Sequence, residues 1–520
     1  MGGLLLVALA VRAFAWSQTA VIFNDGPVFL AMAEAIADGR FADVLAHPYH
    51  PLYPGLIAAL AMFSVDFETA AVAVSILGGL LSIAALFWFV RRSFGRDIAW
   101  IAAWILALHP WAIDFSSDVM SDGIYAGFFL LAFALMTRVL EVPRLTNSVV
   151  MGLVCGLAFL VRPEGAGLLI AGVVLFALRA LGNPDLRRRA ALACAAAGLA
   201  FALAVTPFVA FVSETTGEFT LTQKKSISNL VSGSAQAGSV VDRESARDRL
   251  EDLGQRVRLP AQSIRTGGPA AKRPERSPAG ALSALGRVVT TSMAAFRWEL
   301  ILLALIGIWA SRSDPESRHP GGPISLVLVA YMGLLVLLVW GAGYVSRRHA
   351  LPPWLPVIGY AALGAKTLWR ASVVRVFQKD SAMANRLCES RTLCAAIVVA
   401  LVLGWGARDF RQRRTDRIPE RVAAEWLATQ RPDSGAVAAQ KLRVAYYAEA
   451  DFVPLPSGER GRVAENLRRK NARWVVIDRD NLSHHRGLEE GLGDWLRLVH
   501  TVPFEERAIL VLSIEPRPAR

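Results

Sequence analysis

Apolar residues recur along this chain in blocks separated by short polar stretches, from the N-terminus to about residue 408. Each block is about 20 residues long, the length with which a helix crosses the hydrocarbon core of a bilayer. A soluble protein of this size would spread its apolar residues with the period of a strand or of an amphipathic helix. The pattern therefore predicts a helical protein that crosses a membrane many times.

Eleven segments are predicted spans, at residues 3–20, 67–90, 98–113, 123–140, 147–161, 165–182, 190–212, 295–311, 323–343, 353–369 and 392–408. The first is expected to remain as a span rather than to be cleaved as a signal peptide, because no charged region precedes it and Arg12 interrupts its apolar centre. Together the spans form a transmembrane domain, residues 1–408, with outer loops at 21–66, 114–122 and 213–294.

The distribution of Lys and Arg predicts which loops face the cytoplasm. Seventeen of them lie in the loops 91–97, 138–144, 179–189, 311–319 and 366–391. Only four lie in the alternate segments 21–66, 114–122, 162–164 and 344–352. The first set is expected in the cytoplasm. The second set, the 213–294 segment and the C-terminal tail are then expected outside the inner membrane.

The break at Arg162-Pro163-Glu164 decides this topology. Without it, 147–182 would be one long helix and the basic residues 187–189 would lie outside, against the charge rule. We therefore predict a break there.

The segment 213–294 is rich in Ser, Gly, Arg and Pro after Gly233 and is expected to be an outer loop with one amphipathic helix near 243–258. Such a loop serves equally as a spacer or as a lid.

From residue 409 to 520 the pattern changes to that of a small soluble α/β domain. It predicts helices at 419–430 and 463–470 and strands at 435–440, 474–478 and 508–514. No glycine-rich phosphate loop or catalytic trio stands out in this region. The expected fold class is thus a polytopic helical membrane protein with about eleven transmembrane helices and a small C-terminal α/β domain.

Composition argues against two classes of function, nucleic-acid binding and sites built from cysteine pairs. Of the 520 residues 54% are hydrophobic and 19% are charged, and the net charge is +13. That charge does not indicate nucleic-acid binding, because many basic residues lie in short loops where topology explains them. Cys155 and Cys194 lie within apolar runs, while Cys388 and Cys394 lie beside a basic loop. No pair therefore indicates a disulfide framework or a metal site.

Candidate chemistry begins with acidic residues in the predicted outer loops. Asp25 precedes Pro27 and the amphipathic stretch 28–37, a few positions beyond the first span. There a carboxylate lies at the level of the lipid headgroups, near a lipid phosphate. The alternative is that Asp25 caps the helix that begins near Pro27.

The second outer segment holds Asp114, Asp118 and Asp122, with no basic residue from 109 to 123. Carboxylates this close repel one another, which favours a cation or a polar substrate as a partner. In a helix their spacing of four would place them on one face and give them a shared target. The alternative is a solvated helix entry with Asp122 at the N-terminus of the fourth span. Asp25 and Asp122, from different loops, are candidates to divide the work of a transfer reaction between a general base and a group that holds a cation or the surroundings of a leaving phosphate.

Basic residues on the same side complement these acids. Arg162 and the cluster Arg347-Arg348-His349 are among the few cations of the short outer segments, so the orientation rule does not explain them. A guanidinium group suits a phosphate bidentately. The alternative for Arg347 and Arg348 is snorkelling at the interface. His50 and His349 lack the close spacing of metal ligands.

At these residues the chain resembles the GT-C glycosyltransferases, especially family 39 and the group of protein O-mannosyltransferases, lipid A aminoarabinose transferases and core galacturonosyltransferases. Asp25, before a helix ending in Ala37-Asp38-Gly39, is similar to the catalytic acid of that group. Three further elements follow in the same order: His50-Pro51-Leu52-Tyr53-Pro54, Ser121-Asp122, and an Arg-Pro motif within residues 156–165. Arg347-Arg348-His349-Ala350-Leu351-Pro352 is similar to a late Arg-Tyr-x-x-Pro element, with Arg-His in place of the usual aromatic.

The resemblance implies a polyprenyl-phosphate sugar donor, inversion at the anomeric carbon, and a lipid, glycan or protein acceptor at the outer face of the inner membrane. Dependence on a divalent metal varies among members and stays open. Asp25 and Asp122 are the expected catalytic residues. The expected substrate-binding residues are His50, Tyr53, Asp118, Arg162, Glu164, Arg347, Arg348 and His349.

Two other classes of protein are weighed against this one. A secondary transporter should show ionisable residues at mid-membrane and paired repeats with broken helices. Here the acids lie at span ends, and no internal repeat is evident. A membrane-anchored sensor that uses its outer α/β domain would leave the acidic loops unexplained.

Overall fold

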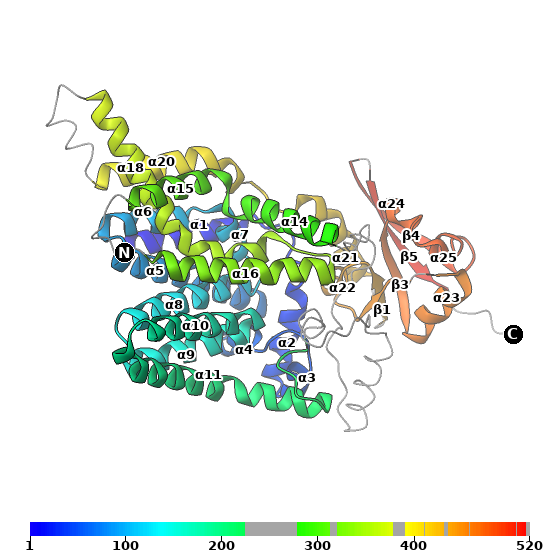
Figure 1. Ribbon diagram of the computed structural model, residues 1–520. Coiled ribbons are helices and arrows are strands. Elements are labelled where there is room, and N and C mark those ends of the chain that lie inside the picture. The colour runs from blue at the N-terminus through cyan, green and yellow to red at the C-terminus, as the bar shows by residue number, and fades with distance from the viewer. Residues whose placement is uncertain are drawn as a thin grey trace.

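The computed structural model describes residues 1–223, 278–312, 320–377, 390–409, 411–430, 435–456, 458–505 and 507–515. A bundle of long helices forms most of the molecule, and a small region with a β-sheet lies against one end of the bundle (Figure 1). This arrangement confirms the predicted fold class of a helical membrane protein with a C-terminal sheet region.

A helix or bent helix pair corresponds to each predicted span: α1 (Gly2–Ser17), α5 (Phe67–Ser93), α6 (Arg96–Ala107) with α7 (Pro110–Ser116), α8 (Asp122–Glu141), α9 (Leu145–Val161), α10 (Ala166–Leu181), α11 (Arg187–Thr216), α15 (Trp298–Arg312), α16 (Gly321–Ala342), α18 (Ile358–Val376) and α20 (Ser390–Asp409). By length and apolarity alone, five of the described helices are able to cross a membrane, or seven when two bent pairs count as one span each. The count of eleven stays a prediction.

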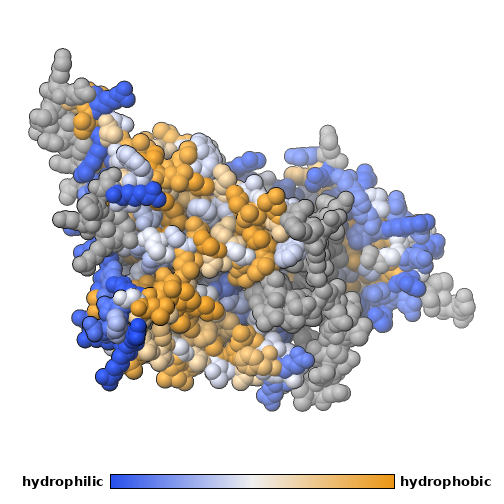
Figure 2. Space-filling view, in the orientation of Figure 1, coloured by the Kyte–Doolittle hydropathy of each residue, from blue (hydrophilic) through white to orange (hydrophobic). Residues whose placement is uncertain are grey.

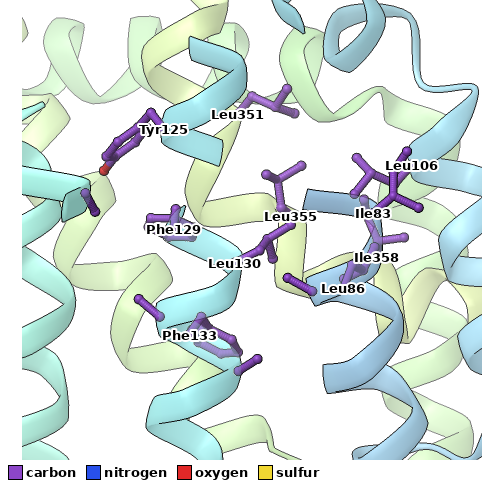
Figure 3. Close-up of a cluster of buried hydrophobic side chains, with 14 of the residues drawn as sticks. Ile83, Leu86, Leu106, Tyr125, Phe129, Leu130, Phe133, Leu351, Leu355 and Ile358 are labelled. Atoms are coloured by element: carbon purple, nitrogen blue, oxygen red, sulfur yellow. The ribbon is translucent and has the colours of Figure 1, made fainter. Parts of the chain in front are cut away.

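Glycines bring α5 and α8 together at the centre of the bundle. A Cβ atom on Gly78 would lie 2.3 Å from the Ile124 Cα, and one on Gly123 would lie 2.5 Å from the Ser75 carbonyl oxygen. Only a residue without a side chain permits backbones to approach this closely. Next to this contact, toward the C-terminal ends of both helices, α5 and α8 bury a core of large apolar side chains (Figure 3). The first residue of α8, Asp122, is therefore held at a fixed position beside α5.

The described residues of the basic loops 91–97, 138–144 and 179–189, together with Lys366, lie at one end of the bundle. Arg92 at the end of α5 pairs with Glu141 at the end of α8, and Lys366 of α18 pairs with Asp97 of α6 at 3.0 Å. The opposite end carries the short helices α2 (Gly26–Ala37), α3 (Phe41–Leu45) and α4 (Leu52–Ala61), with the sheet region beyond them (Figure 1). Figure 2 shows an apolar band between the two hydrophilic ends.

The chain breaks between α9 and α10, as predicted. Arg162 is extended, with φ −152° and ψ 134°, because the residue before a proline is disfavoured in the helical region. A single turn of 3₁₀ helix, η1 (Pro163–Gly165), follows it. Pro143, just before α9, and Arg179, near the end of α10, line the same small pocket. The two helices therefore run in opposite directions, and Arg162 lies at the turn between them.

Three predicted segments differ in detail from the structure. The segment 98–113 is bent, because α6 and α7 meet at 60° where Pro110 follows the extended residue His109. Residues 278–294 were assigned to an outer loop, which was wrong, because with residues 295–296 they form α14 (Pro278–Phe296), which meets α15 at 89°. The first turns of the segment 353–369 are 3₁₀ helix, η3 (Pro352–Val357), since three prolines remove hydrogen-bond donors. The helix expected near 243–258 lies outside the described residues.

The C-terminal region contains a five-stranded sheet of order β2-β1-β3-β5-β4. Its strands are β1 (Ala436–Ala439), β2 (Phe452–Pro454), β3 (Ala472–Asp478), β4 (Leu496–Phe504) and β5 (Arg507–Ile514). The first three are parallel, while β5 is antiparallel to β3 and to β4. The helices are α21 (Ile418–Thr429), α22 (Leu442–Tyr447), α23 (Arg460–Arg469), α24 (Arg479–Leu482) and α25 (Arg486–Glu489). All five elements predicted here are present, whereas β2, β4, α22, α24 and α25 were not predicted.

Candidate functional site

Asp25 lies at the start of α2 but does not cap it. A turn from the Phe23 carbonyl oxygen to the Gly26 N–H, 2.9 Å, leads the chain into the helix. The Asp25 side chain makes no capping hydrogen bond. Its Oδ2 instead accepts a hydrogen bond of 2.8 Å from Nη1 of Arg348, which lies 323 residues away in the sequence. The capping alternative therefore does not describe this carboxylate.

Tyr49 is the second partner of Asp25, and the sequence analysis did not single it out. Its hydroxyl lies within hydrogen-bonding reach of the Asp25 carboxylate, and its ring stacks on Phe29 at 5.1 Å between centroids. Burial, and then the negative charge of Asp25, raise the pKa of Tyr49 above its ordinary value, so the phenol remains a donor. The only feature of the sequence that pointed to Tyr49 was its position between Pro48 and His50 in a predicted outer segment.

Arg348 belongs to the short helix α17 (Arg347–Ala350) and is the one member of its cluster that contacts Asp25 among the contacts described. Burial lowers the pKa of Arg348, but the charges of Asp25 and Asp122 outweigh this effect and raise it. Arg347 lies instead over the Trp111 ring, 4.3 Å from its centroid, and His349 bonds through Nδ1 to the Ser346 hydroxyl at 2.8 Å. The three neighbours in sequence thus have three different surroundings.

A second ion pair joins Asp122 to Arg162. Oδ1 of Asp122 accepts a hydrogen bond of 2.7 Å from Nη1 of Arg162, and the two side chains are only 5% and 7% exposed. Burial lowers the pKa of Arg162, but the charges of Asp122 and Glu164 raise it more. The guanidinium also lies over the ring of Tyr125, 5.5 Å from its centroid. Glu164, in η1, therefore belongs to the same charged group.

The two ion pairs lie next to each other. The charge of Asp122 acts on Arg348, and the charges of Arg348 and Arg162 act on each other. The chain contributes to this group from the start of α2, the start of α8, the turn after α9 and α17. Five residues proposed from the sequence, Asp25, Asp122, Arg162, Glu164 and Arg348, are thereby brought together at one end of the bundle.

His50 and Tyr53 are held by other contacts. His50 is buried, with Nδ1 at 2.5 Å from the Phe159 carbonyl oxygen and Nε2 at 2.9 Å from the Thr222 hydroxyl. The Tyr53 hydroxyl bonds to the Ser75 hydroxyl at 2.9 Å, and Ser75 donates to the Met120 carbonyl oxygen at 2.9 Å. Tyr53 thus supports, through α5, the loop that ends at Asp122.

The three acids of the second outer segment do not share a target. Asp114 pairs with Arg413 at 3.3 Å, Asp118 pairs with Arg414, and Asp122 pairs with Arg162. They do not lie on one helical face either, because α7 ends at Ser116. Burial raises the pKa of Asp118, although Arg414 and the Val119 N–H act in the opposite direction. Arg413 and Arg414 were not predicted as site residues, since they belong to the segment after the last span.

In the described part of the chain, no three or more His, Cys, Asp or Glu side chains gather so that they would hold a metal ion. Asp25 and Asp122, the catalytic carboxylates proposed from the sequence, each contact a guanidinium group. The chemistry of this group is therefore that of paired carboxylates and guanidinium cations, with a phenol beside them.

Residues 46–211 match the sequence family described as dolichyl-phosphate-mannose-protein mannosyltransferase. The fold is similar to that of ArnT from Cupriavidus metallidurans bound to undecaprenyl phosphate, with a TM-score of 0.59 and 14% identity, and to its apo state, with 0.57 and 13%. Both alignments cover 98% of this chain and 97% of the other. Arabinosyltransferase EmbB from Mycobacterium smegmatis aligns over 78% of this chain and 41% of its own, with a TM-score of 0.37 and 12% identity. No curated protein sequence matches the chain.

Proposed function

We propose that this chain, a membrane protein of the GT-C glycosyltransferase superfamily, transfers a sugar from a polyprenyl-phosphate donor to an acceptor hydroxyl at the outer face of the inner membrane. The observation that carries the proposal is the accessible Asp25–Arg348 pair beside the buried Asp122–Arg162 pair. ArnT, which has a similar fold, was solved with undecaprenyl phosphate, a lipid of the proposed donor class.

The accessibility of the two pairs assigns them different roles. The Asp25 and Arg348 side chains are 16% and 18% exposed, so this pair is more open to a substrate than the Asp122–Arg162 pair. Asp122 is nearly inaccessible and already bonded, so its role is to orient Arg162 and to compensate its charge. Asp25 is therefore the proposed general base, and Asp122 is a positioning residue rather than a second catalyst.

In the proposed reaction the acceptor oxygen attacks the anomeric carbon of the donor sugar, and its proton passes to the Asp25 carboxylate. The bond between the anomeric carbon and the phosphate oxygen breaks, and the polyprenyl phosphate leaves with the electron pair. Attack opposite to the leaving group inverts the anomeric centre. Arg348 is the group that binds that phosphate, since a guanidinium fork matches phosphate oxygens, and the buried Arg162 adds positive charge beside it. Before this attack, when the donor binds, its phosphate replaces Asp25 as the partner of Arg348 and so frees the base.

The distribution of charge supports the orientation of the site. The described residues of the basic loops 91–97, 138–144 and 179–189, together with Lys366, lie at the end of the bundle opposite the ion pairs. By the positive-inside rule that end faces the cytoplasm. The charged group, α2 and the C-terminal sheet region then face the outside of the inner membrane.

Transport of a solute is the competing function, and it needs ionisable groups along a path through the spans. Arg12 is buried within α1, but its guanidinium donates to the Ser116 hydroxyl at 2.8 Å and to the Ala107 carbonyl oxygen at 3.2 Å. A cation at the C-terminus of α6 satisfies carbonyl groups that the bend leaves without helical partners. Arg12 thus has a structural role at the bend between α6 and α7.

The test is an assay of sugar transfer with the purified chain in proteoliposomes. Radiolabelled polyprenyl-phosphate hexoses and pentoses serve as donors, and envelope extract from cells that lack the gene serves as acceptor. Asp25→Asn should lower transfer by about 10²- to 10⁴-fold, the usual contribution of a general base. The matched control is Asp38→Asn, because Asp38 follows α2 in the same outer segment and is 63% exposed. Full transfer by the Asp25 variant would reject the proposed role of Asp25. Uptake of free solute without transfer would favour the transporter.

A further inference from the structure

The segment after α20 runs back to the beginning of the first outer segment. The Arg413 N–H donates to the Gln18 carbonyl oxygen at 2.9 Å, and the Ala20 N–H donates to the Arg413 carbonyl oxygen at 3.2 Å. These bonds form a parallel bridge between Thr19 and Arg413. The C-terminal part of the chain is therefore attached to the stretch that leads directly into Asp25.

Arg414 makes the closest side-chain contacts along this stretch. Its Nη1 donates to the Val21 carbonyl oxygen at 2.6 Å, and its Nη2 pairs with the buried Asp118. The other oxygen of Asp118 accepts hydrogen bonds from the Val119 N–H at 2.7 Å and from the Phe23 N–H at 3.4 Å. Arg414 itself has a positive φ of 56°, a conformation that a non-glycine residue keeps only where several contacts impose it.

The Phe23 ring connects Arg414 to the proposed base. The Arg414 guanidinium lies 5.4 Å from the centroid of this ring, and the Arg348 guanidinium lies 5.0 Å from it. Two cations on one ring repel each other unless each is compensated, and here Asp118 compensates Arg414 while Asp25 compensates Arg348. The order of contacts is Asp118, Arg414, Phe23, Arg348 and Asp25.

From this chain of contacts we propose that Arg414 is a positioning residue for sugar transfer. It acts through Phe23, which it holds in place for Arg348, and through the backbone of residues 21–23, which sets the position of Asp25. This inference rests on the proposed function, because it assigns Arg414 a part in the same reaction. It also makes the segment between the membrane domain and the sheet a component of the site, although none of its described residues forms a hydrogen bond or ion pair with the proposed base.

The experiment uses full-length protein in the proteoliposome assay above and compares Arg414→Gln with Arg421→Gln. Arg421 is the matched control, because it also comes from the C-terminal part and donates to the Ala20 carbonyl oxygen at 2.8 Å, but its ring contact is Tyr447 and its acid is Glu425. Displacing a catalytic group by about 1 Å costs roughly 100-fold in rate, so Arg414→Gln should lower kcat by about 10- to 100-fold. The KM for the donor and the melting temperature should follow the control variant.

Phe23→Leu provides an independent test, since it removes the ring and leaves both arginines with their acids. It should lower kcat as Arg414→Gln does, and the double variant should lose little more than either single variant, because the residues act through one path. Arg414→Lys keeps the charge beside Asp118 but not the planar fork, and it should recover only part of kcat. If Arg414→Gln does not fold, the kcat of Phe23→Leu tests the proposal by itself.

The proposal is overturned if Arg414→Gln and Phe23→Leu retain wild-type kcat, or if their losses in kcat equal that of Arg421→Gln and scale with melting temperature. Either result would make Arg414 a structural residue only. Wild-type protein that transfers no sugar would instead count against the proposed function itself. The two failures are thus distinguished by the activity of the unmodified chain.

Discussion

Replacing Asp122 by Asn should destabilise the protein much more than the loss of an exposed ion pair. The change keeps the shape of the side chain but leaves the Arg162 guanidinium buried without its carboxylate partner at 2.7 Å. Breaking a buried pair from one side costs about 3–5 kcal/mol, mostly because the remaining charge is desolvated and uncompensated. Glu164 still acts on Arg162. We therefore expect the lower end of that range, about 3 kcal/mol.

The matched control is Asp97→Asn at the opposite end of the bundle. Asp97 pairs with Lys366 at 3.0 Å but is 48% exposed, so its loss should cost less than about 1 kcal/mol. The free energy of unfolding is measured by denaturant titration of the purified protein in detergent micelles, with helix content as the signal. The double variant Asp122→Asn with Arg162→Gln should recover much of the stability, because no unpaired charge remains.

Two results would refute this reasoning. In the first, Asp122→Asn and Asp97→Asn lose the same stability, which would mean that water reaches the Arg162 pair as freely as it reaches the surface. In the second, the double variant is as unstable as the sum of its single variants, which would mean that the two side chains contribute independently. In a buried ion pair, removing one charge costs more stability than removing both, whereas a solvated pair or two independent side chains would not behave in this way.

The remaining predictions concern one structural and one functional contact. Asp66 caps α5 through a hydrogen bond of 2.9 Å from the Thr69 N–H, so Asp66→Ala should cost about 1 kcal/mol of unfolding free energy. That hydrogen bond also lowers the pKa of Asp66, so the stabilisation should be complete above about pH 4 and lost as the pH falls through the lower folded-state pKa, which denaturant titrations at several pH values will test. Tyr49→Phe removes a hydrogen bond to the proposed base and should lower kcat roughly tenfold. Added to Asp25→Asn it should change nothing further, and an additive loss would contradict a shared role.

Much of the helical bundle follows from local chemistry, and so do its main irregularities. Apolar blocks predict helices because a backbone in lipid must satisfy its own hydrogen bonds. The break after α9 follows from Pro163, which forces Arg162 out of the helical region. Pro110 has the same effect on His109 and produces the bend between α6 and α7. This bend was not predicted, because apolar residues on both sides of Pro110 favoured a single span. α14 was missed because the serine- and proline-rich composition of the segment 213–294 outweighed the apolar spacing of its last residues.

For the charged group around Asp25 and Asp122, the sequence predicted several of the residues but not which acid pairs with which cation. Burial makes an unpaired charge costly, so each buried acid near the outer end needed a cation. Which cation it meets depends on the packing of segments that lie 40 to 323 residues apart. Asp118 illustrates the limit, because its partner Arg414 comes from beyond the last span and 296 residues away. No periodicity or spacing contains that information.

This dependence on distant segments has a consequence for how the site is assembled. Asp25 and Asp122 belong to the first third of the chain, but Arg348 and Arg414 join them from α17 and from the segment after α20. Until those later segments pack, the first outer segment contains a carboxylate without the guanidinium that orients it. The Asp25–Arg348 pair therefore forms only when the chain has folded as far as α17, and a defect in that or a later segment would impair the site without altering any of its acids.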